Sequence, residues 1–435
     1  MRKSAIAVWM GIICIFWLLL EGCGLNEKGK ESRDAEGEPV TIRFAWWGEE
    51  NRNERTREAV ELFMKKNPDI VVQTVSYPFE TYGENMDIFV QTGYMPDVWQ
   101  GYVGADNDYM QKGLVEPLDT YVERGLIDIG NISSALLETG RIDGKLYGLS
   151  LGCNVKCMAV VAKDFEDVGL KIPENGYSSW DELEAALLAV KGEKEGAVAG
   201  HIFNRDFLFD YFCLQRGERK FQAGEVTKIG FSEKTYVDYY RMWMRWEEEG
   251  IVPAYVETYH ARMGHSASVE KTDYVADTLY SNQFEERAAE SGKKMELIPL
   301  PGTEEMGGME IRPGIHICMS SLSEQKDAAA RLIDFLINDL DANRILDAER
   351  GMPASSVVRD ALFQEFNEAQ RAMAEIIQYA EKNSISTGPV SVSDHKELDD
   401  GVQGGLMEEL EQQIMLRQIE PEEAYNIISE RFGDN

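Results

Sequence analysis

The N-terminus carries an uninterrupted apolar run, residues 5–20, which follows Arg2 and Lys3 and ends at Leu20-Glu21-Gly22-Cys23. The run is shorter than the roughly 20 residues that a membrane-spanning helix needs, and the small residue Gly22 lies close to its end, as in a cleavable secretory signal. The pattern predicts that residues 1–22 are an export signal and that the rest of the chain folds outside the cytoplasm. The alternative is an uncleaved signal anchor, which would also hold the chain at a membrane surface.

The chain beyond the signal has 413 residues (435 minus 22), enough for about two domains with a substantial core. The net charge of −33 becomes −34 when Arg2, Lys3 and Glu21 are removed (−33 − 2 + 1). A strongly acidic chain repels nucleic acid and other polyanions, so we expect no nucleic-acid partner. The acidity itself indicates a solvated surface.

Four cysteines follow residue 23, namely Cys153, Cys157, Cys213 and Cys318. Their spacing contains no pair of CxxC motifs and no disulfide framework, so we expect buried free thiols. We expect neither a structural metal site nor a cofactor.

Residues 26–38 contain no large apolar side chain and therefore cannot bury one. We assign residues 23–39 to a flexible tether. From Val40 the pattern changes to strand, helix, strand, helix, strand, and the two helices end near Pro68 and Gly93. Strands separated by single helices pair in parallel, so this opening predicts an α/β fold with helices on both faces of a sheet.

Aromatic side chains gather where these strands end. In such sheets, ligands bind beyond the carboxyl ends of the strands. The three segments at this rim are Trp46-Trp47-Gly48, Tyr77-Pro78-Phe79 and Trp99-Gln100-Gly101-Tyr102.

Further helices are predicted after the capping serines Ser178 and Ser179, over residues 232–249 and over residues 328–340, and a strand is predicted over 275–280. The helix over 232–249 carries a stripe of tyrosines and tryptophans. Because the stripe has helical spacing, we interpret it as core packing and not as a binding surface.

A series of short motifs resembles the solute-binding lipoproteins of ATP-binding cassette importers, in the branch that binds sugars and oligosaccharides. The resemblance covers almost the whole mature chain, and it is specific because the motifs occur in order behind a lipobox-like Leu-x-Gly-Cys. The motifs are Trp46-Trp47-Gly48 with Arg52 and Thr56, Phe63-x-x-x-Asn67-Pro68-x-Ile70, Gly93-x-x-Pro96-Asp97-Val98, Gly113-Leu114-Val115-x-Pro117-Leu118, Asp143-Gly144-Lys145-Leu146-Tyr147-Gly148-Leu149, Ser179-Trp180-Asp181-Glu182-Leu183 and Arg350-Gly351-Met352-Pro353-Ala354-Ser355.

The resemblance implies a periplasmic-binding-protein-like α/β fold of two lobes, each with a mainly parallel sheet, and a ligand cleft between the lobes. On that basis lobe 1 would hold residues 40–152 plus 276–320, and lobe 2 would hold 153–275 plus 321–435. It also implies a lipid on Cys23 that anchors a monomer to the extracellular face of a bacterial cell membrane, and delivery of ligand to the permease subunits of the importer.

A sugar site needs flat aromatic surfaces for the C–H faces of the ring and side chains that donate and accept hydrogen bonds. We therefore predict Trp46 and Trp47 as stacking platforms and Trp99 and Tyr102 as further walls. Polar contacts are predicted from Asn51, Arg52, Tyr280, Asn282 and Gln283. The resemblance adds Asn154, because relatives often carry an asparagine there that faces the cleft.

Two other classes of function stay open on the residues alone. An extracellular carbohydrate-active enzyme would need a placed pair of carboxylates, but with 77 acidic residues pairs such as Glu49 and Glu50 occur by chance. No catalytic motif such as His-Glu-x-x-His or Gly-x-Ser-x-Gly is present. A binder of another solute, such as a polyamine, would want carboxylates between aromatic rings.

Overall fold

A computed structural model of the chain describes residues 38–101, 103, 108–199, 205–222, 225–256, 274–384, 398 and 405–433. The predicted signal, Cys23 and almost all of the tether lie outside the described residues, as does Tyr102. Residues 39–435 form one compact unit, within which two α/β lobes are built on two sheets. Among the described helices, none combines the length and the apolar character needed to cross a bilayer.

The first lobe is built on a five-stranded sheet that confirms the predicted opening order of strand, helix, strand, helix, strand. In spatial order the strands are β2 (Ile70–Tyr77), β1 (Val40–Trp47), β3 (Val98–Gly101), β13 (His316–Met319) and β6 (Gly148–Ser150). β1 pairs in parallel with β2 and β3, whereas β13 runs antiparallel to β3 and β6. The intervening helices are α1 (Glu50–Lys66) and α2 (Phe79–Thr92).

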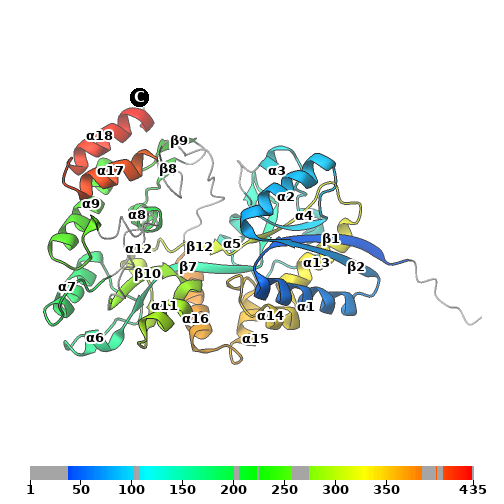
Figure 1. The fold of residues 1–435 in the computed structure, drawn as a ribbon, viewed down its shortest axis with the longest axis horizontal. Helices are drawn as coiled ribbons and strands as arrows, with labels where there is room; N and C mark the ends of the chain where they lie inside the picture. Colours follow the sequence, from blue (N-terminus) through cyan, green and yellow to red (C-terminus); the bar gives the residue numbers. More distant parts are fainter. Residues whose placement is uncertain are drawn as a thin grey trace, which may run out of the picture. The chain divides into compact units, whose positions relative to one another are not determined.

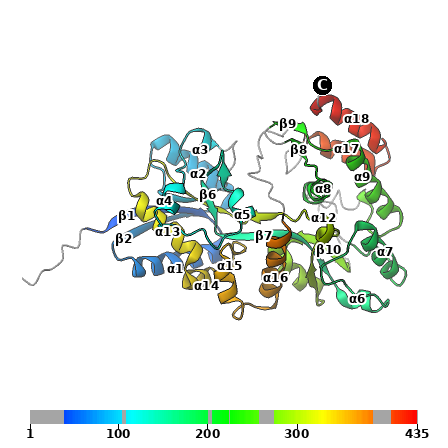
Figure 2. The same ribbon diagram turned by 180° about the vertical axis from the view of Figure 1, so that it is seen from behind.

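The second sheet is organised on one long strand, β7 (Gly152–Val160). Its second half pairs with β10 (Ala276–Tyr280) and β11 (Glu296–Ile298), and its first half pairs with β12 (Ile311–Pro313) and β14 (Met352–Pro353). All four pairings are antiparallel, which differs from the mainly parallel sheet that we predicted for this lobe. Figures 1 and 2 show β7 running from the part that contains β1 into the part that contains β10.

Helices and short strands complete the two lobes. Beside the first sheet are α3 (Asp108–Gln111), α4 (Asp119–Glu123), α5 (Ser134–Glu138), β4 (Arg141–Ile142), β5 (Lys145–Leu146), α13 (Lys326–Asn338), α14 (Leu340–Leu346) and α15 (Ser356–Leu362). The remainder are α6 (Ala162–Glu166), α7 (Trp180–Lys191), α8 (Arg205–Leu214), β8 (Phe221–Gln222), β9 (Glu225–Ile229), α9 (Glu233–Glu248), η1 (Ser281–Gln283), α11 (Phe284–Ser291), α12 (Thr303–Met306), α16 (Glu368–Asn383), α17 (Leu406–Met415) and α18 (Pro421–Phe432).

The structure corrects two parts of the predicted lobe division. α13 and α14, which we assigned to lobe 2, pack on α1 in lobe 1, where Phe335 meets Phe63 with ring centroids 5.3 Å apart. A short connection follows β13, and consecutive elements usually pack as neighbours, so α13 returns to the sheet it has just left. β10 and β11, which we assigned to lobe 1, pair with β7 in the second sheet.

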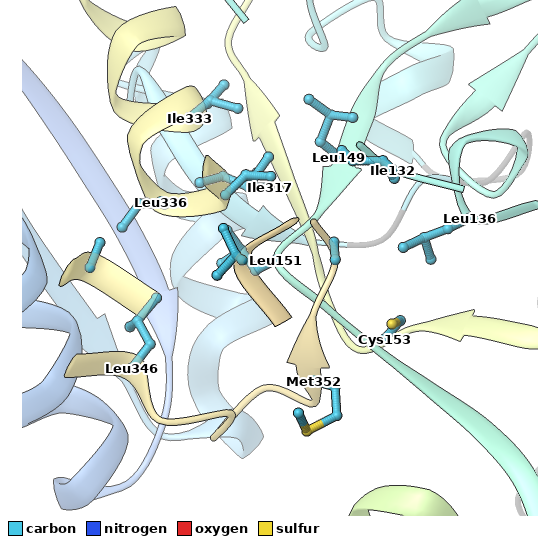
Figure 3. Packing of buried hydrophobic residues seen from close by; sticks show 14 of the residues in the cluster. Ile132, Leu136, Leu149, Leu151, Cys153, Ile317, Ile333, Leu336, Leu346 and Met352 are labelled. Atoms are coloured by element: carbon cyan, nitrogen blue, oxygen red, sulfur yellow. The ribbon is translucent and has the colours of Figure 1, made fainter. Parts of the chain in front are cut away.

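The core of the first lobe continues into the start of β7. Figure 3 shows Leu151 near Ile317 of β13, and it also labels Cys153 and Met352 of the same cluster. All four are at most 6% exposed and belong to one apolar cluster. The four described cysteines are free and buried, as predicted, and the aromatic stripe of α9 lies in the core of the second lobe.

His316 of β13 is buried inside the first lobe as a neutral imidazole. Its Nδ1 accepts a hydrogen bond from the Val103 N–H at 3.2 Å, so the proton sits on Nε2, which lies 3.1 Å from Thr139 Oγ1. Burial lowers the pKa of His316 from 6.5 to about 4. The folded state therefore resists protonation at a pH where the unfolded chain accepts a proton.

We expect stability to fall as the pH drops from 6.5 to 4, because the unfolded chain binds a proton there that the folded chain does not. Above pH 6.5 the histidine is neutral in both states, so no stability is lost to its protonation. Below pH 4 the loss in the free energy of unfolding reaches its maximum of about 3 kcal/mol. Urea unfolding of the wild type and of His316→Asn at several pH values checks this expectation, since the variant keeps a polar group without the titration. Identical pH slopes for the two proteins would contradict it.

Candidate functional site

The predicted stacking platforms lie inside the first lobe. Trp46 is 0% exposed and its indole Nε1 donates to Asn53 Oδ1 at 2.8 Å, so its predicted role is wrong: no ring face is open to a ligand. Trp47 and Trp99 are 7% and 2% exposed and pack in a second apolar cluster. The physical reason is that β1 lies inside a sheet covered on both faces, so successive residues such as Trp46 and Trp47 both enter cores.

Arg52 and Asn51, at the start of α1, make contacts within the protein. Arg52 Nε lies 2.7 and 2.8 Å from the two carboxylate oxygens of Glu349, which forms an ion pair from the first helix to the segment before β14. Asn51 is exposed, and its Oδ1 accepts from Arg55 Nε at 3.0 Å. Arg52 therefore ties α1 to Glu349, which the sequence did not indicate.

Asn154 lies on β7 where this strand passes from one lobe to the other. Its neighbours Cys153 and Val155 point into the apolar cluster of the first lobe, so Asn154 lies on the opposite face. Its Oδ1 is buried and accepts no hydrogen bond from any residue that the structure describes. A buried carbonyl oxygen without a partner costs roughly 1–3 kcal/mol, so this oxygen has unused capacity to accept a hydrogen bond.

The backbone of Gly351 lies against the Asn154 amide. The backbone of Gly351 has φ +93°, which favours glycine, and a Cβ at this residue would lie 2.8 Å from Asn154 Oδ1. The glycine in the motif Arg350-Gly351-Met352-Pro353 thus allows the backbone to approach the Asn154 side chain closely. Met352 and Pro353 of the same motif pair with the first residues of β7.

A row of charged groups continues from Asn154 along the same face. Lys156 is two residues further on β7, and Arg312 of β12 lies directly opposite Asn154 in the strand register. Glu310 joins the two cations: its Oε2 lies 3.5 Å from Lys156 Nζ and 2.9 Å from Arg312 Nε. Tyr280 of β10 lies opposite Lys156, and its ring centroid is 5.8 Å from Arg312 Cζ.

The members of this row differ in burial. Lys156 and Glu310 are 2% and 6% exposed, whereas the Arg312 side chain keeps 32% of its surface exposed. Among the described residues, the Nη groups of Arg312 have no hydrogen-bond partner, because its contact with Glu310 uses Nε. Arg312 therefore offers free donors next to the free acceptor of Asn154.

The electrostatics follow from burial and from Glu310. Burial lowers the pKa of the Lys156 ammonium, and Glu310 opposes that shift. Burial is the largest single influence on Arg312 and lowers its pKa, but the charge and hydrogen bond of Glu310, together with the influence of Tyr280 and Asp210, outweigh burial, so the pKa of Arg312 lies above its ordinary value. Arg312 therefore remains a cation at any physiological pH.

The other predicted contacts near β10 have mixed outcomes. Tyr280 joins the charged row, as described above. Gln283 is exposed and uses Oε1 to accept from the Tyr280 N–H at 2.9 Å, which caps the turn before α11. Asn282 is exposed at the same turn.

Sequence reasoning missed Lys156, Glu310 and Arg312. A signal was available for Lys156, because a lysine inside the apolar run from Val155 to Val161 must be paired if that run is a buried strand. Glu310 and Arg312 alternate across Ile311, which is the spacing of side chains on one face of a strand.

Three other features of the described residues were candidates for a site: metal-binding side chains, the buried thiols and a groove on the second lobe. No group of three or more His, Cys, Asp or Glu side chains among them is placed to hold a metal ion. Burial raises the pKa of Cys153 to about 12, so its thiol stays protonated. A groove of about 1080 Å³ lies between α11, β11 and α16, and none of the predicted site residues lines it.

Comparisons with known proteins agree with this architecture. Residues 47–339 match the family model described as bacterial extracellular solute-binding protein. An extracellular solute-binding protein family 1 structure from Alicyclobacillus acidocaldarius superposes with a TM-score of 0.77 at 24% identity, covering 92% of this chain and 98% of that one.

Two further relatives carry named ligands. A periplasmic oligogalacturonide-binding protein from Yersinia enterocolitica has a TM-score of 0.73 at 19% identity, covering 90% of this chain and 97% of that one. The multiple sugar-binding protein of Streptococcus mutans is 25% identical over 187 residues, which is 43% of this chain and 41% of that protein. At these identities the structural likenesses establish the fold.

The Gly351 geometry gives a test of the site framework. We expect Gly351→Ala to lower the free energy of unfolding by about 1–3 kcal/mol, because φ +93° is strained for alanine and the new Cβ meets Asn154. Gly83→Ala is the matched control: Gly83 lies inside α2 with no atom near its would-be Cβ, so alanine should stabilise by up to about 1 kcal/mol. Chemical denaturation measures both, and a neutral Gly351→Ala would argue against this framework.

Proposed function

The chain belongs to the bacterial extracellular solute-binding proteins, and from this premise we propose that it captures a sugar or oligosaccharide in a cleft between its two lobes. The loaded protein, acting as a monomer, then delivers the sugar to the permease of an ATP-binding cassette importer. The sugar would lie against the face of β7 that carries Asn154, with Arg312 and Tyr280 beside it.

This proposal depends on the adjacent Asn154 Oδ1 and Arg312 Nη groups, which have no hydrogen-bond partner among the described residues. A sugar hydroxyl both donates and accepts hydrogen bonds, so one hydroxyl can donate to Asn154 Oδ1 and a neighbouring hydroxyl can accept from Arg312 Nη. The ring of Tyr280 adds a flat apolar surface next to these polar groups. This combination of an aromatic ring with free donors and a free acceptor suits a carbohydrate.

The alternatives gain less support from this site. A polyamine would be repelled by the Arg312 guanidinium, whose Nη groups have no partner among the described residues, and would need carboxylates in its place. A glycosidase needs two carboxyl groups free to act on one bond, whereas Glu310 is engaged with Lys156 and Arg312. Tyr102, which lies outside the described residues, stays a predicted wall of the site.

Single substitutions test Asn154 and Arg312 directly. We expect Asn154→Ala and Arg312→Ala each to weaken sugar binding by about 10- to 100-fold, since each removes hydrogen bonds worth roughly 1.5–3 kcal/mol to the bound sugar. Calorimetry with the best ligand from a thermal-shift screen of oligosaccharides measures the loss. Arg124→Ala, which removes an exposed arginine paired with Asp327, is the control and should bind as the wild type does. Undiminished affinity in both site variants would reject this location.

We also propose that Cys23 is acylated and that the mature chain begins there, which tethers the protein to the outer face of the membrane. Residues 23–39 would then hold the folded unit away from the lipid. In a bacterial host, Cys23→Ser should shift the protein from the membrane fraction to the medium. Mass spectrometry decides between anchors: a wild-type chain that retains residues 1–22 without lipid would indicate a signal anchor instead.

A further inference from the structure

The segment between α14 and β14, residues 347–351, has a strained backbone, and we refer to it as the strap. Asp347 and Ala348 have φ +51° and +54°, in the left-handed region that is unfavourable for residues with a Cβ, and Gly351 has φ +93°. Such conformations persist only where the surrounding structure holds them, and they cluster at functional positions. The contacts that hold the strap therefore indicate its role.

Arg350 is the buried anchor of the strap. Its side chain is 4% exposed and enters the first lobe, where Nε donates to Gln100 Oε1 of β3 at 3.0 Å and Nη2 donates to Thr56 Oγ1 of α1 at 2.8 Å. Its Nη1 donates to Glu349 Oε2 at 3.2 Å, and Glu349 is also held by Arg52 of α1. Because a guanidinium is a planar fork of fixed donors, these bonds in different directions attach the strap to both α1 and β3.

The backbone of Arg350 is confined as closely as its side chain. A Cβ at Gly152, the first residue of β7, would lie 2.6 Å from the Arg350 carbonyl oxygen, and a Cβ at Gly314 would overlap that oxygen. The Gly314 N–H donates to the Gly152 carbonyl at 2.7 Å. The next residue, Gly351, lies against Asn154, where a Cβ would be 2.8 Å from Oδ1 and 3.0 Å from Nδ2. A displaced strap would therefore change the space beside the Asn154 amide.

We propose that Arg350 is a positioning residue for the ligand site: it anchors the strap and so keeps Gly351 against Asn154, which holds the Asn154 amide in one orientation. The inference rests on the proposed sugar-binding function and adds a residue that acts on the site without touching the ligand. An amide that rotates exchanges its acceptor for its donors, and fixing it in advance spares the ligand the loss of that freedom. Arg350 thus contributes to affinity through Asn154.

A double-mutant cycle on sugar affinity tests this dependence. We expect Arg350→Gln, which removes the fork of donors, to weaken binding of the tightest oligosaccharide from the thermal-shift screen by about five- to tenfold. In the Asn154→Ala background the same substitution should change affinity by less than about twofold, because the side chain on which it acts is gone. Arg331→Gln is the matched control, since Arg331 joins α13 to Asp69 and Asn67, and it should leave affinity unchanged in both backgrounds.

A second measurement needs no ligand. In protein isotope-labelled at asparagine nitrogen, the Asn154 side-chain amide is assigned as the NMR signal that Asn154→Ala removes. Arg350→Gln should shift or broaden this signal, whereas Arg331→Gln should not. Glu349→Gln keeps the shape of a partly exposed side chain and removes its charge, so it loosens the strap more mildly. It takes the place of Arg350→Gln in both measurements if that variant does not fold, as judged by circular dichroism.

The outcomes separate the two proposals. An equal loss of affinity in both backgrounds, wild-type affinity in the strap variant, or an unchanged Asn154 signal would overturn the inference while leaving sugar binding intact. Failure of every oligosaccharide to bind the folded wild type would count against the proposed function, and the amide signal would still decide whether Arg350 positions Asn154.

Discussion

The fold depends on the strand β7, whose side chains contribute to the cores of both lobes. β7 pairs through its first residues with β12 and β14 and through its last residues with β10 and β11. One of its faces is apolar and joins the core of the first lobe through Cys153 and Val155. Because side chains alternate along a strand, the opposite face is fixed at the same time, and that face carries Asn154 and Lys156. The polar site is thus a consequence of the strand that joins the lobes.

Placing charges on such a strand is costly. Moving Lys156 and Glu310 out of water carries a desolvation penalty that their mutual attraction offsets only when the geometry is good. An apolar pair of similar size would stabilise the strand at least as well. The buried ion pair therefore adds little to the stability of the fold, and it is consistent with the site proposed above. Asn154 carries a similar cost, because its buried Oδ1 has no partner in the part of the chain that the structure describes.

The sequence predicted the first lobe well because its signals are local. Hydrophobic periodicity and the breaks near Pro68 and Gly93 indicated β1, α1, β2, α2 and β3, and these elements form in that order. The predicted role of Trp46 as a stacking platform was wrong, and the reason is physical. A strand end next to a ligand and a strand end inside a covered sheet carry the same aromatic residues, so Trp46 looked like a platform although it is part of the core.

The sequence by itself determined the family, the α/β class and the opening order of elements, because hydrophobic periodicity and motif order can be read from residues that are close in the chain. It also predicted buried cysteines, because their spacing contains neither a metal motif nor a disulfide framework. It also supplied Asn154 through its resemblance to relatives. Only the tertiary structure decided which helices cover which sheet and which charges meet. Asn154, Glu310 and Gly351 are far apart in the chain, and their contacts depend on the register of β7 with β12 and β14, which no local signal encodes.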